Sequence, residues 1–207
     1  MAEEEQKMKV KKLLFYLLAV FMGGCVLSLH PLYTENDLIF EEKLLGTWAE
    51  EGSKETWQFK RANSDSNKYY EMIYIDKEGK KGRFDAGLGK LNNMMFLNIF
   101  PKESELNEND FYKFHILPVN SFVKIENIQP TLEMRVMNPD NLKEMLENDP
   151  NLIKHEIVHD RLVLTASTKE LQEFLKAHAN DEGLFGEPSK MKRVQPKDPN
   201  APESTKS

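Results

Sequence analysis

The feature that most limits how this chain can fold is a series of short alternating segments that begins at residue 45. Each segment alternates apolar and polar residues, and a polar or glycine-containing turn separates it from the next one. A period of two places successive side chains on opposite faces of a strand, so the pattern predicts strands rather than helices. The predicted strands are residues 45–48, 55–59, 69–75, 83–91, 94–100, 111–117, 122–128 and 131–137.

Seven or eight strands at this spacing predict an antiparallel meander, which we expect to curl into a barrel or half-barrel that protects its edges. The period changes after Asn138, which precedes a proline and predicts a helix that ends before Pro150. A capping box at 167–170 predicts a second, amphipathic helix, preceded by a strand at 161–166. The expected fold is therefore mainly β (α+β), with two or three short helices in the C-terminal third.

The N-terminus has the layout of a secretory signal. A basic stretch at 7–12 precedes the uncharged apolar run 13–22, which is shorter than the roughly 20 apolar residues of a membrane-spanning helix. Translation could begin at Met1 or at Met8, and the second start would give the cleaner basic region. The single cysteine of the chain, Cys25, follows the run directly after two glycines.

The segment Met22-Gly23-Gly24-Cys25 resembles the lipobox of bacterial lipoproteins. This resemblance implies that Cys25 is lipidated and becomes the mature N-terminus. In bacteria with two membranes, it also implies an outer-membrane location rather than an inner-membrane one, because Val26 stands where an Asp would favour retention. A plain signal peptide followed by an unmodified cysteine is the alternative. The whole chain is similar to small envelope lipoproteins with an L-x-G-T-W first strand.

These observations divide the chain into four parts. We expect a signal peptide at 1–24, a tether at 25–37, one β-rich domain at 38–187 and a disordered tail at 188–207, which holds four prolines and few apolar residues. The net charge is −6. The signal contributes +1 and the tail +3, which leaves −10 on residues 25–187. An acidic domain argues against a nucleic-acid partner.

The segment Gly46-Thr47-Trp48 is similar to the G-x-W near the start of lipocalins and other calycin barrels, where the Trp closes one barrel end. In such a barrel the interior could hold a small apolar ligand. The candidate lining residues are Trp48, Phe59, Tyr74, Phe84, Phe96 and Phe114. The alternatives are an ordinary core Trp in a first strand and an interior filled by side chains.

The sequence His155-Glu156-Ile157-Val158-His159 has the H-E-x-x-H pattern. On a helix, His155 and His159 could bind zinc while Glu156 activates water, with a third ligand from Glu170, Glu173, Asp181 or Glu182. The segment also alternates like a strand. In a strand the two His residues would lie about 13 Å apart, at ~3.3 Å per residue, which is too far to share one metal.

The favoured interpretation is a membrane-anchored envelope lipoprotein that acts as a binding or structural module rather than as an enzyme. It needs no cofactor, and its partners are the membrane together with a small apolar ligand or an envelope protein. The alternative is a zinc-dependent hydrolase that uses His155, Glu156 and His159.

Overall fold

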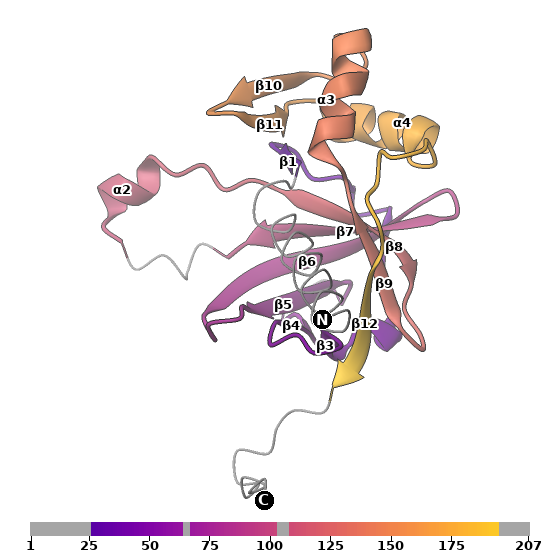
Figure 1. The fold of residues 1–207 in the computed structure, drawn as a ribbon. Coiled ribbons are helices and arrows are strands. Elements are labelled where there is room, and N and C mark those ends of the chain that lie inside the picture. Colours follow the sequence, from indigo (N-terminus) through magenta and orange to yellow (C-terminus); the bar gives the residue numbers. More distant parts are fainter. Residues whose placement is uncertain (1–25, 64–66, 103–107, 195–207) are drawn as a thin grey trace, which may run out of the picture.

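The centre of the molecule is an antiparallel barrel (Figure 1). The structure is a computed structural model that describes residues 26–63, 67–102 and 108–194. The barrel strands, in spatial order, are β3 (Gly46–Glu50), β4 (Thr56–Arg61), β5 (Tyr69–Ile75), β6 (Lys81–Leu91), β7 (Met94–Pro101), β8 (Ser121–Asn127), β9 (Leu132–Val136) and β12 (Ser189–Val194). Each strand pairs antiparallel with the next, and β12 pairs with both β9 and β3, which closes the barrel. This confirms the expected mainly-β barrel with short helices.

The barrel interior is filled by the side chains that alternate inward along the strands. The buried cluster includes both tryptophans together with Phe59, Tyr70 and Leu88. Each inward position on one strand faces an inward position on its neighbour, as Leu88 on β6 faces Leu97 on β7. The sequence period of two thus produces a single packed core inside the barrel.

A second layer lies against the outside of the barrel and forms the upper part of Figure 1. It consists of α3 (Pro139–Asn148), the hairpin β10 (His155–Val158) and β11 (Arg161–Leu164), and α4 (Thr168–His178), all between β9 and β12 in the chain. The Asn138 side chain caps α3, and Ser167 and Glu170 form the predicted capping box of α4. Apolar side chains of this layer pack against outward-facing Phe96 and Phe122.

The predicted strand at 111–117 is wrong. The segment contains the short helix α2 (Asp110–Phe114), which begins at an Asn109 side chain that accepts a hydrogen bond from the Tyr112 backbone. β7 pairs directly with β8, so the intervening segment has no place in the sheet. In Figure 1, α2 stands away from the barrel at the end of a long connection.

The expected disordered tail from residue 188 is wrong for residues 189–194, which form β12 and complete the barrel. Prolines precede and follow this strand but do not interrupt it, and Met191 points into the core with 4% exposure. Residues 195–207 lie outside the described part of the chain.

The expected tether is also wrong for the residues that the structure describes. Val26 and Leu32 are buried in the outer core cluster. Between them, β1 (Leu27–Ser28) pairs parallel with β11. Beyond the tether, β2 (Leu38–Ile39) pairs with the end of β6, and η1 (Glu42–Leu44) leads into β3.

The predicted signal peptide, the two alternative starts and Cys25 lie outside the described residues. Among the described helices, none combines the length and the apolar character needed to cross a bilayer.

Candidate functional site

The candidate ligand-lining residues do not gather around one cavity. Phe59 is 1% exposed within the barrel core, and Tyr74 and Phe84 pack partly buried against the same cluster. Phe96 belongs to the other cluster, outside the barrel, where its ring lies 6.1 Å from that of Phe185. Phe114 lies on α2 and is 85% exposed. A ligand inside the barrel would therefore have to replace core side chains.

Trp48 lies on β3 and is fully buried in the barrel core. Its indole N–H donates to the Leu44 carbonyl at 2.8 Å, which ties the last residue of η1 to the barrel core. The Arg193 guanidinium lies 4.4 Å above the indole ring, and it donates to the Leu45 carbonyl and, at 2.8 Å, to the Lys43 carbonyl. Gly46 has a φ of +120°, and a Cβ there would collide with Arg193. These contacts give Trp48 a structural role.

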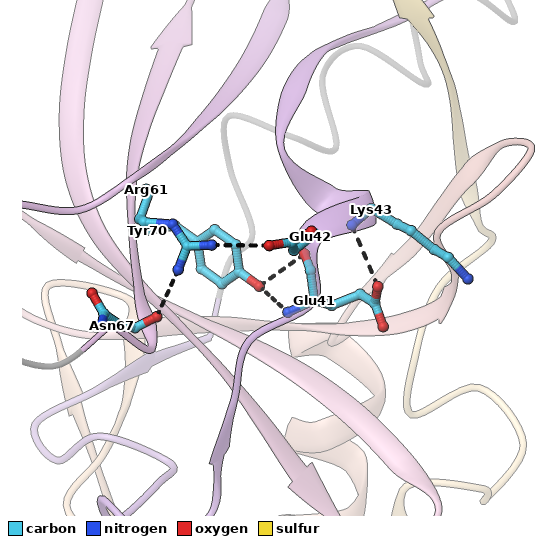
Figure 2. Close-up of polar contacts among 6 residues, drawn as sticks. All are labelled: Glu41, Glu42, Lys43, Arg61, Asn67 and Tyr70. Carbon is cyan, nitrogen blue, oxygen red and sulfur yellow. Dashed lines mark hydrogen bonds and ion pairs between the residues drawn. The ribbon is translucent and has the colours of Figure 1, made fainter.

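The residues before η1 are tied to the barrel by a neighbouring polar group, shown in Figure 2. The Tyr70 hydroxyl accepts from the Glu41 backbone N–H at 2.6 Å, and burial raises the pKa of Tyr70 to about 12. Arg61 forms an ion pair with Glu42 at 3.2 Å and lies 3.9 Å over the Phe40 ring. This group secures the chain where it enters β3, a role that the sequence patterns did not indicate.

The H-E-x-x-H segment lies on a strand and a turn, not on a helix. His155 to Val158 form β10, and His159 has the left-handed φ of 48° in the turn to β11. The His155 ring nitrogen Nδ1 lies 2.9 Å from the Ile153 carbonyl oxygen. The arrangement that zinc peptidase chemistry requires, two imidazoles on one helical face, is therefore not formed.

Two of the proposed third ligands, Glu170 and Asp181, are engaged elsewhere. Glu170 caps α4 and pairs with Lys154 at 2.8 Å, and these hydrogen bonds lower the pKa of Glu170 to about 2. Asp181 lies 2.7 Å from the His178 ring. Within the described ranges, no group of three or more His, Cys, Asp or Glu side chains is placed to hold a metal ion.

A surface hollow of about 720 Å³ lies between β8, β9 and the loop that follows α4. Lys124 is 9% exposed, and its ammonium donates to the Ala179 carbonyl at 3.0 Å and to Asn180 at 3.1 Å. Arg135 pairs with Glu126 at 3.2 Å and donates to the Gly186 carbonyl. These groups are used to hold the loop against the barrel.

Two buried asparagines hold the N-terminal segment. Asn98 on β7 accepts from the Leu32 backbone N–H at 3.0 Å and donates to Asn120 at 2.9 Å. Asn120 and Ser28 exchange backbone hydrogen bonds at 2.8 and 2.9 Å. Further along, the Tyr33 ring crosses β6 at Gly87, where a Cβ would come within 2.6 Å of it. The segment is therefore fixed from its first described residue onward.

The chain matches no family model, no curated protein and no solved structure. The function has to be inferred from the residues of this molecule.

Proposed function

We propose that this chain is a bacterial envelope lipoprotein, anchored to the outer membrane through an acylated Cys25, whose barrel serves as a non-catalytic structural or binding module. The basic stretch, the short apolar run and the lipobox-like sequence before Cys25 support the anchor. Two or more acyl chains, or one acyl chain together with a second membrane-binding feature of the protein, give stable attachment to a bilayer.

The observation that carries the proposal is the burial of Val26, the residue that follows Cys25. Val26 is 4% exposed and belongs to the outer core cluster, and β1 begins at the next residue. Cleavage before Cys25 leaves every contact of the described fold in place. Cleavage only a few residues later, as for a plain signal peptide ending further along, would remove Val26 and β1.

The barrel supports a structural or binding role because side chains fill its interior and because Lys124 and Arg135, in the hollow beside β8 and β9, bind the loop that follows α4. A partner would bind outside the barrel. Among the two classes of partner expected from the sequence, an envelope protein therefore fits this molecule better than a small apolar ligand held in the interior.

The test is metabolic labelling of the full chain with an alkyne-bearing fatty acid in a bacterium with two membranes, followed by separation of the membranes. We expect label on the wild-type chain in the outer-membrane fraction, a mature N-terminus at Cys25, and no label on Cys25→Ser. The variant is a strict control because the chain has one cysteine. Equal labelling of the two chains, or a mature N-terminus beyond Val26, would contradict the proposal.

A further inference from the structure

The large hydrophobic side chains that are exposed among the described residues are confined to three short segments. All seven large hydrophobic side chains that are exposed there lie at Leu29, on and just after α2, or on β10. They are Leu29, Phe111, Tyr112, Phe114, Leu117, Ile157 and Val158. Such clustering marks an interaction surface, whereas single scattered residues would not.

The three segments are joined through β1. Ser28 exchanges backbone hydrogen bonds with Asn120, which is three residues beyond Leu117, the last apolar residue of the α2 segment. On its other side, β1 pairs with β11, and β11 pairs with β10, which carries Ile157 and Val158. Leu29 follows β1 directly and donates its backbone N–H to the Leu164 carbonyl at 3.0 Å. The strand that leads back to Val26 therefore lies between the other two apolar segments.

The direction of β1 brings its N-terminal end toward the tip of the β10–β11 hairpin. β1 is parallel to β11, with Leu27 opposite Val163, so its beginning points the same way as Arg161 at the start of β11. Val158 faces Arg161 across the turn and is 50% exposed. In Figure 1, this hairpin tip and α2 project from the same side of the molecule.

We infer that these three segments form a membrane-docking face, in which the side chains of α2 and of the hairpin tip insert into the lipid headgroup and upper acyl region. This inference rests on the proposed lipid anchor. Consecutive Cα atoms are about 3.8 Å apart, so a lipid on Cys25 would be attached one residue before Val26, which is buried in the folded domain.

The chemistry of the face fits a bilayer surface. Phe111 and Phe114 stand three positions apart on α2 and are 78% and 85% exposed, so both can enter lipid from one helix. Charged neighbours such as Lys113 and Glu156 limit insertion to the interface, about 5–10 Å deep. Tyr112 adds an amphipathic ring of the kind that favours this depth. Fully burying one such Phe or Leu side chain favours the bound state by about tenfold or more.

The test uses the acylated full chain in vesicles of phosphatidylcholine and phosphatidylglycerol. In one set of vesicles the phosphatidylcholine acyl chains carry bromine, which quenches the fluorescence of a tryptophan that enters the lipid. Reporters are Phe114→Trp and Ile157→Trp, each compared with the wild type, because Trp48 and Trp57 are buried in the barrel. The matched control is Asn93→Trp, at an exposed turn on the opposite end of β6 and β7 from the connection to α2. Near-ultraviolet circular dichroism checks that each variant folds.

We expect the fluorescence that the new tryptophan of Phe114→Trp or Ile157→Trp adds to the wild-type signal to be quenched in brominated vesicles and protected from aqueous iodide. The fluorescence that Asn93→Trp adds should persist in brominated vesicles and be quenched by iodide. If both reporters stay bright and iodide reaches them, the docking inference is overturned. It is also overturned if both reporters stay bright in brominated vesicles but are protected from iodide in native membranes, because a protein rather than lipid then covers the face. Fatty-acid label on the same samples separates these results from failure of the anchor: an acylated but undocked chain refutes this inference alone.

Discussion

The closing of the barrel by β12 makes a quantitative prediction about the C-terminus. We predict that a chain truncated after Pro188 shows no cooperative unfolding transition, whereas a chain truncated after Val194 unfolds like the intact protein. The two truncations differ only by residues 189–194, which pair with Glu50 to Thr47 on β3 and with Met134 to Leu132 on β9. Removing the strand leaves both of those edges open and uncovers the core between them.

A single side chain sets the minimum size of the effect. Met191 is 4% exposed and belongs to the barrel core, and truncating a buried Met to Ala costs about 2–5 kcal/mol. A loss of 1 kcal/mol lowers the midpoint of a chain this size by about 2–4 °C, so Met191→Ala should lower it by about 4–20 °C. Lys192→Ala on the same strand is the control, since its ion pair with Glu51 is exposed and its midpoint should hardly move.

The measurement is thermal unfolding in one detergent, followed by the near-ultraviolet circular dichroism of Trp48 and Trp57. Both report on the core that β12 covers, and Arg193 lies over the Trp48 ring. Equal midpoints for the chains ending at Pro188 and at Val194 would refute the role of β12 as the closing strand. Equal effects of Met191→Ala and Lys192→Ala would refute the inward orientation of Met191.

Three further predictions concern other parts of the molecule. Asn98→Ala leaves the Leu32 N–H unpaired, so it should lower the free energy of unfolding measured by urea titration by about 1–3 kcal/mol. It should also speed amide hydrogen exchange at Leu32, whereas Asn93→Ala, at an exposed position, should change neither quantity. The pKa of Tyr70 is raised to about 12, so the stability from its neutral hydroxyl is complete below pH ~10 and lost as the pH approaches 12. Tyr70→Phe should reduce that alkaline loss, and an unchanged loss would contradict this cause. Because His155 lies on a strand, His155→Ala should leave the zinc content and the melting midpoint of the purified chain unchanged, and loss of stoichiometric zinc would reverse this conclusion.

Local patterns were enough to predict the features that depend on neighbours in the chain. The strand alternation, the Asn138 cap and the capping box at Ser167 all act within a few residues, and the structure contains each of them. The strand predicted at 111–117 failed because its alternation is real but β7 and β8 pair without it. Alternation identifies a possible strand, and only a partner makes it one.

The contacts that fix both ends of the fold could not be predicted in this way because they join residues far apart in sequence. Arg193 is 145 positions from Trp48, and a short basic strand next to prolines has the composition of a tail. The first and last strands of the predicted series would have left unpaired edges. This was the available signal that one more strand was needed to close the barrel. Likewise, Asn98 is a buried polar residue in an apolar strand, and such a residue needs a hydrogen-bond partner. This was the available signal that another backbone segment, here the one at Leu32, crosses β7.

These two fixed ends also limit where a partner could bind. Under the proposed anchoring, the lipid is attached one residue before the buried Val26, and the docking inference turns the face that carries α2 and the β10–β11 tip toward the bilayer. The barrel interior is filled, and Lys124 and Arg135 in the hollow beside β8 and β9 bind carbonyls of the chain that follows α4. If the proposed anchor and docking face are correct, an envelope partner would contact the outside of the barrel away from that face, where β3, β4 and the turn between β6 and β7 lie. Substitutions there should then disturb partner binding without detaching the domain from the membrane.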